Sequence, residues 1–444
     1  MTVHFRGGLP GGGTGGFPGI RRPARRTVFS TVRARWKAPH IMRRMVIFKE
    51  RQVLKMPNMP KRRPADAGNA GHMGEVGILT FHCSDNFGAM LQAYGLKRFL
   101  REHGVRADIV RYAPFYMTGR HWWLPYWPAS GWRGWVRLLL GSPLILLRRL
   151  LIRREYAARR ANMARFRREY LIDIRHPKFR FSTSLGRLPY GIYILGSDQI
   201  WNPNITSGLR AAYFGGFRNG RTERVIAYAA SLGGASLPPG HDREFARLLQ
   251  NVDAVSLREA EAVPYVKRFY QGKVTAVLDP VFLLKEGAWQ EVERLPARPD
   301  YILAYATERN AHMAAYVREL SRRTGLRVVE LDEARIGPPA ELDAAAGPAE
   351  FLGYIHGAAY VVTNSFHGTA FSILYQKRFL AFAHSRLNAR LANVLRLHGL
   401  EDRLCRTGGD IDAPVDWAAV RERTAAEARE SGAFLLDNIF GGRE

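Results

Sequence analysis

The chain has 444 residues, 46% of them apolar, which is enough for two globular domains with sizeable cores. Its 67 Lys and Arg against 39 Asp and Glu give a net charge of +28, and its only cysteines are Cys83 and Cys405. Two cysteines exclude a disulfide framework and fit a reducing compartment. The sequence has no CxxC, HExxH or GxxxxGKS/T motif, so neither a zinc hydrolase nor a P-loop enzyme is supported, and we expect no metal site.

Residues 1–72 carry much of the excess positive charge. They hold 16 Lys and Arg but only two acidic residues, and they include the stretch GGLPGGGTGGFPG. Glycine, proline and like charges cannot build a core, so we predict a disordered basic extension. Three interpretations stay open: an arm for nucleic acid or anionic membranes, a transit-like segment, or an upstream extension with Met73 as the natural start. We favour the last interpretation and expect no nucleic-acid partner.

Between about 119 and 165 the sequence predicts a helical insertion rich in Trp, Leu and Arg. Its most apolar stretch is GWVRLLLGSPLILLRRLLIRR, residues 134–154, in which Arg137, Gly141 and Pro143 interrupt the apolar runs. No stretch of the chain is therefore long enough to span a bilayer. Two interpretations stay open: a hairpin packed on its domain with a solvated basic face, or an interfacial helix in peripheral contact with the inner membrane.

From Met73 onward, short apolar strands alternate with amphipathic helices. The first set of strands comprises EVGILTFH, RADIVRY, YGIYILG, RVIAYAA, AVSLRE and VTAVLDPVFLL, and the second comprises YILAYAT, LRVVELD, AYVVTNS and RFLAFA. Such alternation predicts parallel sheets with helices on both faces. We predict an α/β fold of two Rossmann-like domains, residues 73–290 and 291–444, the second ending in a long helix. A ligand is expected in the crevice between them, at the carboxyl ends of the strands.

The first polar cluster lies in TFHCSDNFGAMLQAYGL, directly after the first strand. Asn86 is expected to cap a helix whose free N–H groups face the crevice, and Gly88 would let a ligand approach the backbone closely. An ordinary helix cap explains the same residues.

The second cluster, GSDQIWNPNIT at 196–206, follows a buried strand. Asp198 is a candidate base, and Trp201 offers a flat face of the kind that sugar sites use. Gln199 and Asn202 can each donate and accept hydrogen bonds. A plain turn would need neither the tryptophan nor the glutamine, so we interpret this loop as functional.

Two further clusters suit an anion and a proton transfer. Arg258 follows a strand in AVSLREAEA, where a guanidinium can grip a phosphate or carboxylate, although a surface ion pair explains it equally well. In VVTNSFHGTA, a strand ends at Asn364 and His367 begins a helix. The N–H groups of Gly368 and Thr369 would form an anion site there, and the histidine can exchange a proton with a hydroxyl.

Together these motifs resemble the polysaccharide pyruvyl transferases. The resemblance runs from Val76 to Arg403 and leaves out residues 1–72. It rests on an ordered set of motifs: NFGAMLQAYGL, YILGSDQIWNP, IAYAASLG, SLRE, VLDPVFLL, VVTNSFHGTAFSILYQKRF and SRLNARLANVLRLHGLEDR.

The resemblance implies two Rossmann-like domains similar to those of GT-B glycosyltransferases. It also implies a reaction in which the enolpyruvyl group of phosphoenolpyruvate moves onto two hydroxyls of one sugar, giving a pyruvate ketal and phosphate. Phosphoenolpyruvate would be the co-substrate, with no other cofactor. The acceptor would be a cell-surface polysaccharide or its nucleotide- or lipid-linked precursor, and the enzyme would be cytoplasmic, with membrane contact through the basic insertion.

The same resemblance assigns roles to the residues found above. His367 would be the acid/base group, Arg258 the anion clamp, and Asp198 a second catalytic group. The donor side would be lined by Asn364, Ser365, Gly368 and Thr369, and the acceptor side by Asn86, Gln199, Trp201 and Asn202.

One position departs from the family pattern. Some members carry arginine two residues before the motif histidine, where this chain has Ser365. We expect Lys377, Arg386 or Arg390 to replace that cation. A GT-B-type glycosyltransferase using a sugar nucleotide is the alternative function, since a shared fold does not settle an activity.

Overall fold

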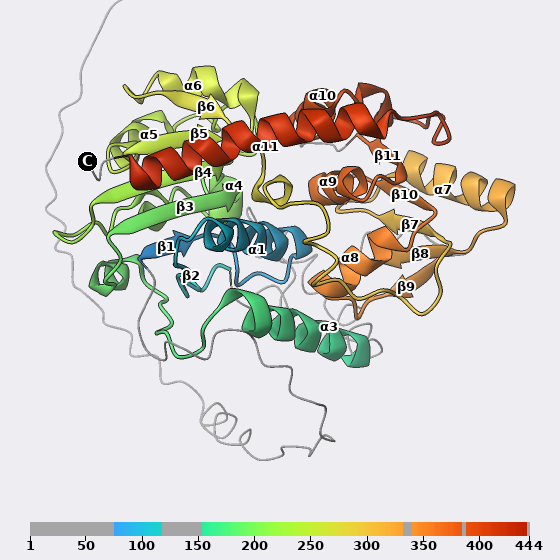
Figure 1. Cartoon of the computed structure of the whole chain (residues 1–444), viewed down its shortest axis with the longest axis horizontal. Coiled ribbons are helices and arrows are strands. Elements are labelled where there is room, and N and C mark those ends of the chain that lie inside the picture. The colour runs from blue at the N-terminus through green and yellow to red at the C-terminus, as the bar shows by residue number, and fades with distance from the viewer. Residues whose placement is uncertain (1–74, 118–152, 332–339, 384–387, 442–444) are drawn as a thin grey trace, which may run out of the picture. The chain divides into compact units, whose positions relative to one another are not determined.

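The computed structural model describes residues 75–117, 153–331, 340–383 and 388–441 (Figure 1). The predictions made for residues 1–72, and for the larger part of the insertion at 119–165, lie outside these ranges. Residues Asn69–Glu444 form one compact unit, so the predicted domain boundary near residue 290 stays a prediction.

The first lobe is built on a sheet of six parallel strands in the order β2-β1-β3-β4-β5-β6. Its strands are β1 (Val76–Leu79), β2 (Ala107–Ile109), β3 (Ile192–Asp198), β4 (Arg224–Ala230), β5 (Ala254–Leu257) and β6 (Val274–Ala276). Its helices are α1 (Phe87–Glu102), α3 (Arg153–Phe166), α4 (Pro203–Thr206), α5 (Asp242–Leu249) and α6 (Val263–Lys267). The central strands are buried along nearly their whole length, which explains why they read as continuous apolar runs.

The second lobe repeats the arrangement, with strand order β12-β11-β10-β7-β8-β9 and every pairing parallel. Its strands are β7 (Ile302–Tyr305), β8 (Val328–Leu331), β9 (Glu341–Asp343), β10 (Tyr360–Thr363), β11 (Arg378–Phe382) and β12 (Leu404–Cys405). Its helices are α7 (Ala311–Thr324), α8 (Pro348–His356), α9 (Phe366–Leu374) and α10 (Asn388–His398), followed by the C-terminal α11 (Trp417–Phe440).

The predicted fold of two parallel sheets with flanking helices is therefore confirmed. Two details differ from the prediction. The strand expected over 274–284 ends at Ala276, because Asp279 caps a short 3-10 turn that begins at Pro280, a residue that cannot donate to a sheet. The short strands β9 and β12 were not predicted, since two or three residues carry too little periodicity to be recognised.

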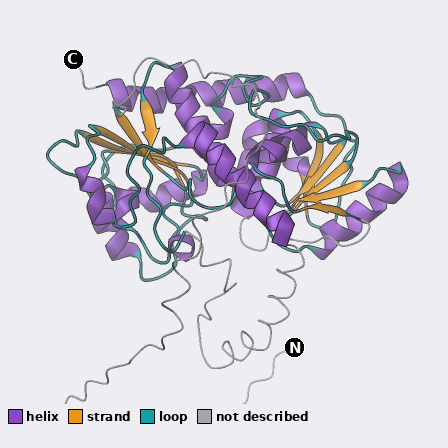
Figure 2. Ribbon diagram, turned by 90° about the horizontal axis from the view of Figure 1, so that it is seen from below, coloured by secondary structure: helices purple, strands orange, loops and turns teal. Residues whose placement is uncertain are grey.

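The two lobes share one apolar core, and helices lie between the two sheets (Figure 2). The ring of Phe87, at the start of α1, stacks on Phe351 of α8 with centroids 4.9 Å apart. Trp289 meets Phe371 of α9 at the same distance, edge to face. This packing places the starts of α1 and α9 next to the same cavity.

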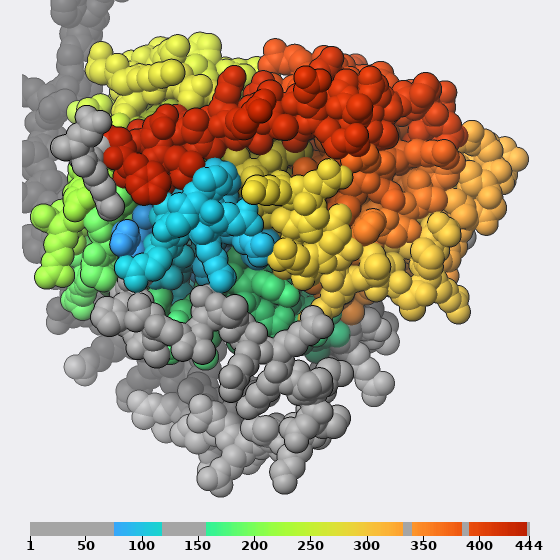
Figure 3. Space-filling view, viewed as in Figure 1, coloured from blue at the N-terminus to red at the C-terminus, as the bar shows by residue number. Residues whose placement is uncertain are grey.

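The C-terminal helix α11 leaves the second lobe and packs on the first. Ser431 Oγ accepts a hydrogen bond of 2.9 Å from the Leu278 N–H, and Arg224 donates to the Asn438 carbonyl at 2.8 Å. In Figure 3, α11 (red) runs along the molecule across both lobes. None of the described helices is both long enough and apolar enough to cross a membrane.

Candidate functional site

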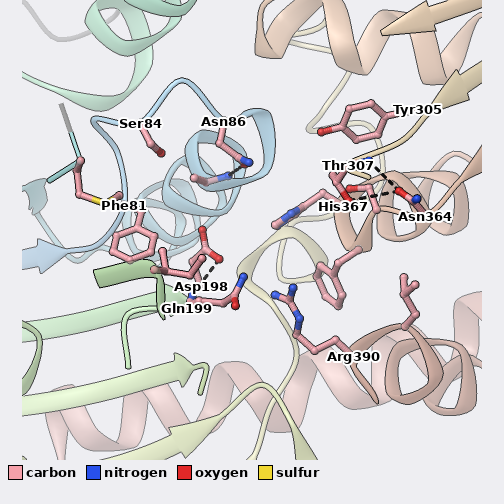
Figure 4. Close-up of a pocket in the computed structure, with 16 residues that line it drawn as sticks. Phe81, Ser84, Asn86, Asp198, Gln199, Tyr305, Thr307, Asn364, His367 and Arg390 are labelled. Carbon is pink, nitrogen blue, oxygen red and sulfur yellow. Dashed lines mark hydrogen bonds between the residues drawn. The ribbon is translucent and has the colours of Figure 1, made fainter. Parts of the chain in front are cut away.

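A cavity of about 370 Å³ lies where polar loops follow the strands of both sheets (Figure 4). The first lobe contributes the loops after β1 and β3, and the second contributes the ends of β7 and β10 with the starts of α9 and α10. This is the position predicted from the alternation of strands and helices. The cavity is lined by Phe81, Ser84, Asn86, Ala89, Met117, Asp198, Gln199, Ile205, Tyr305, Thr307, Asn364, Ser365, Phe366, His367, Arg390 and Leu391.

His367 lies in the first turn of α9 and is 9% exposed. Ser365 caps this helix, since its Oγ accepts a hydrogen bond of 3.3 Å from the Gly368 N–H. Thr363 Oγ1 accepts from the Ser365 N–H and donates to the Tyr305 carbonyl, which ties the end of β10 to β7. These bonds hold the turn that presents the imidazole to the cavity.

The imidazole of His367 packs directly on the backbone of α1 in the other lobe. A Cβ atom at Gly88 would lie 1.9 Å from His367 Nδ1, far inside any permitted contact. Gly88 was predicted to let a ligand approach the backbone. In the structure the His367 ring, not a ligand, lies against the backbone at Gly88. Glycine is therefore needed at position 88 for the two lobes to pack this closely.

Behind the imidazole lies a buried ion pair of the first lobe. Arg258 Nη2 and Asp279 Oδ2 are 2.6 Å apart, and His367 Nε2 is 3.6 Å from the same oxygen. Arg258 also donates to Ser197 Oγ. Burial alone would raise the pKa of Asp279, but the charge of Arg258 and the His367 ring outweigh it and lower that pKa to about 2. The carboxylate therefore stays ionised beside the histidine.

The structure corrects the role predicted for Arg258. Its side chain is buried, belongs to the ion pair with Asp279 and does not line the cavity. Its charge is thus balanced inside the wall. Its guanidinium lies 5.0 Å from the centroid of Phe366, which does line the cavity.

Arg390 of α10 is the guanidinium that does line the cavity. It is 6% exposed, and its Nε has no hydrogen-bond partner. Within the described ranges, no carboxylate oxygen lies within salt-bridge distance of it. Burial lowers the pKa of Arg390, which reflects how weakly its charge is solvated.

Of the other candidates for the cation missing at Ser365, Lys377 does not line the cavity. It lies just beyond the far end of α9, where its Nζ donates to the His356 carbonyl at 2.7 Å. The predicted donor contact of Lys377 is therefore replaced by a structural one. Arg386 lies outside the described residues.

Four predicted donor residues use backbone or side-chain polar groups within the fold. Asn364 Oδ1 accepts from the Thr307 N–H at 2.7 Å, and its Nδ2 donates to the Glu308 carbonyl. The Gly368 N–H is taken by Ser365 Oγ, and the Thr369 N–H by the Ser365 carbonyl. Asn364 and Ser365 line the cavity, whereas Gly368 and Thr369 do not.

On the first lobe, the candidate residues Asn86, Asp198 and Gln199 line the cavity. Asn86 caps α1, accepting from the Ala89 N–H at 2.9 Å. Asp198 has a φ of 76°, a left-handed conformation that costs a non-glycine residue about 1–3 kcal/mol, and its Oδ1 accepts from the Gln199 N–H. Figure 4 shows Asp198 and His367 on opposite sides of the cavity.

Trp201 and Asn202 do not line the cavity. Trp201 is fully buried, stacked on Phe214 at 5.1 Å, and its Nε1 donates to the Tyr213 carbonyl. It therefore offers no face to a sugar, and its role is packing. Asn202 caps α4 and donates from Nδ2 to Gln199 Oε1 at 2.7 Å, so it orients a cavity residue from behind.

Sequence reasoning missed several residues of the site. Ser84, Tyr305 and Thr307 line the cavity, but single polar residues after a strand give no specific signal. Asp279 had a detectable signal, because an acid follows a strand and precedes proline in VLDPVFLL. Within the described ranges, no group of three or more His, Cys, Asp or Glu could hold a metal ion.

Comparison with known proteins gives one sequence family and several distant structures. The sequence model of the polysaccharide pyruvyl transferase family matches residues 86–386. No curated protein sequence matches the chain. Among solved structures, a UDP-GlcNAc 2-epimerase from Methanocaldococcus jannaschii is 10% identical, covering 83% of this chain and 99% of its own, with a TM-score of 0.40. The ADP-heptose heptosyltransferase II of E. coli is 11% identical, covering 80% and 99%, with a TM-score of 0.34.

We predict that Gly88→Ala destabilises the protein despite the higher helix propensity of alanine. The added methyl meets the His367 ring, and overpacking of this kind costs about 1–3 kcal/mol against a gain of about 1 kcal/mol in propensity. Urea unfolding measures the difference. Gly234→Ala is the matched control, since a Cβ there meets nothing within 4 Å. Equal stability of both variants would show that the ring does not press on α1.

We predict that Asp279→Asn lowers the free energy of unfolding by about 3–5 kcal/mol at pH 7, because it leaves the buried Arg258 without its counter-ion. Wild-type stability from this carboxylate is fully present above the unfolded pKa near 3.8 and is lost as pH falls towards 2. The difference in the free energy of unfolding between wild type and variant should therefore shrink below pH 4. Glu75→Gln, which breaks an exposed pair with Arg106, should change little.

Proposed function

The chain belongs to the polysaccharide pyruvyl transferase family, and we propose that it transfers the enolpyruvyl group of phosphoenolpyruvate to a sugar, forming a pyruvate ketal. One observation carries the proposal: the cavity between the lobes holds His367 together with Arg390, a buried guanidinium that makes no salt bridge among the described residues. A histidine and such a cation suit a donor that is an anion and must be protonated.

The donor's phosphate and carboxylate would lie towards Arg390. Buried N–H groups without partners are unfavourable, so an anion that accepts from Arg390 Nε would be bound with more than the usual gain. The helices α1 and α9 both begin at the cavity, and their positive ends add to the attraction. Arg390 would then supply the cation that Ser365 does not.

In the proposed reaction, His367 delivers a proton to the methylene carbon of phosphoenolpyruvate, which leaves an oxocarbenium-like centre at the neighbouring carbon. One sugar hydroxyl forms a bond to that carbon, and a second hydroxyl then displaces the phosphate. One hydroxyl proton ends in the new methyl group through the histidine, and the other leaves with the phosphate. Asp279, held ionised behind the ring, would stabilise the imidazolium.

The acceptor would lie against the first lobe. Asp198, Gln199, Asn86 and Ser84 all line that side and can bond to sugar hydroxyls, and Asp198 faces His367 across the cavity in Figure 4. We propose a saccharide precursor, nucleotide- or lipid-linked, as the acceptor, and no cofactor besides phosphoenolpyruvate. Since phosphoenolpyruvate is a metabolite of the cytoplasm, we propose that the enzyme works there.

We predict that phosphoenolpyruvate raises the melting temperature of the full chain and that nucleoside diphosphates do not. A ligand at 100 times its Kd stabilises the bound fold by about 2.7 kcal/mol. His367→Ala should abolish phosphate release in the presence of an acceptor mixture, and should weaken the thermal shift. A shift with a nucleoside diphosphate alone would favour a glycosyltransferase instead and would reject the proposal.

We predict that Arg390→Met weakens phosphoenolpyruvate binding about 10- to 100-fold, because it removes charge-assisted hydrogen bonds worth about 1.5–3 kcal/mol. Arg390→Lys should recover part of the loss. Arg396→Met is the matched control, since Arg396 lies on the same helix with its side chain 59% exposed. Calorimetric titration gives the Kd values, and equal affinities for the Arg390→Met and Arg396→Met variants would remove Arg390 from the donor site.

A further inference from the structure

A surface of the first lobe beside the cavity combines exposed apolar and basic side chains. Six large apolar residues are exposed in the described part of the chain. Three of them lie on two neighbouring segments: Phe115 in residues 111–117, and Ile174 and Phe181 in residues 173–181. Phe115 is 56% exposed, and Ile174 and Phe181 are each 64% exposed. Single exposed apolar residues are common, but three on adjoining segments form a patch.

The fold holds these two segments together. The Ala113 N–H donates to the Phe179 carbonyl at 2.8 Å, and the Phe179 N–H donates to the Arg111 carbonyl at 2.9 Å. Arg111 Nη1 also donates to the Ile174 carbonyl at 2.6 Å. The rings of Phe115 and Phe181 lie 6.2 Å apart, so the exposed rings sit side by side on a backbone that is hydrogen-bonded in place.

The charge around these rings is positive. Arg175, Lys178 and Arg180 are exposed on the same segment, and the guanidinium of Arg180 lies 4.5 Å from the centroid of Phe115. Asp173, the acid at the start of this segment, is paired with Arg175. Exposed aromatic and aliphatic side chains among Lys and Arg are typical of surfaces that lie in the headgroup region of an anionic bilayer.

The adjoining sequence has the same character. Residues 118–152, which follow directly after the segment that contains Phe115, hold five arginines and five tryptophans and no Asp or Glu. A protein partner with an apolar contact surface would not require this one-sided charge, whereas an anionic lipid surface is complementary to it. The composition of the chain therefore favours a bilayer over a second protein.

We propose that the Phe115–Phe181 surface, formed by Phe115, Ile174, Arg175, Lys178, Arg180 and Phe181, docks on an anionic membrane. Met117, two residues beyond Phe115, lines the cavity, so docking would set the cavity next to the headgroups. A lipid-linked saccharide could then reach it without leaving the bilayer. The choice of a lipid-linked acceptor rests on the proposed function, whereas the docking itself does not.

The test places an environment-sensitive fluorophore on the full chain in a Cys83→Ser background, in which the remaining Cys405 is buried. The fluorophore is attached to Phe181→Cys or, as the matched control, to Phe440→Cys, since Phe440 is 45% exposed on α11. With vesicles of phosphatidylglycerol and phosphatidylcholine, we expect emission at position 181 to rise at least twofold and shift to shorter wavelength. We expect no change at position 440.

Sedimentation with the same vesicles at raised salt tests the apolar contribution, because salt screens the basic segments elsewhere in the chain. Phe115→Ser with Phe181→Ser should reduce binding at least tenfold, whereas Leu295→Ser with Phe440→Ser should not. An unchanged probe at 181, an equal response at 440, or a response to protein concentration without vesicles would overturn the proposal. If phosphoenolpyruvate does not raise the melting temperature but the fluorophore still responds to vesicles, only the proposed function is contradicted.

Discussion

The site depends on the contact between the imidazole of His367 and the backbone of α1 at Gly88. A Cβ at this position would fall 1.9 Å from the ring, so the two lobes can approach this closely only because residue 88 has no side chain. The approach also brings His367 Nε2 to 3.6 Å from Asp279, which belongs to the first lobe. A histidine from one lobe is thereby placed against the other, at a cavity that both lobes line.

The charges around this contact are not evenly matched. Arg258 and Asp279 neutralise each other inside the wall, whereas Arg390, which lines the cavity, makes no salt bridge among the described residues. The two buried guanidinium groups therefore have different roles, because only that of Arg258 forms a salt bridge with a carboxylate. The paired one stabilises the folded state and keeps a carboxylate ionised beside the histidine. Arg390 makes no salt bridge among the described residues, although the buried carboxylate of Glu259 interacts with its charge. An anionic substrate would add a counter-charge beside it.

The sequence was sufficient to predict both sheets and the location of the site, because buried parallel strands are continuous apolar runs and polar clusters such as Asp198 and Gln199 follow them directly. It was insufficient where a role depends on contacts between distant residues. Arg258 and Asp279 look like two separate motifs until the fold pairs them. Trp201 has the residue type of a sugar platform, and only its burial against Phe214 shows otherwise. Gly88 was recognised as a close approach, but its partner, 279 positions later in the chain, was not identifiable without the fold.

Several unfavourable features of this fold gather around one cavity. Asp198 holds a left-handed backbone that strains any residue with a side chain, and buried nitrogens of Arg390 and His367, which also line the cavity, lack hydrogen-bond partners. At the same cavity, polar groups of Ser365 and Asn364 are satisfied by neighbouring backbone. Strained and unsatisfied residues occur elsewhere in the described chain as well, but Asp198, Arg390 and His367 line one cavity. A ligand bound there would supply hydrogen bonds that the fold does not.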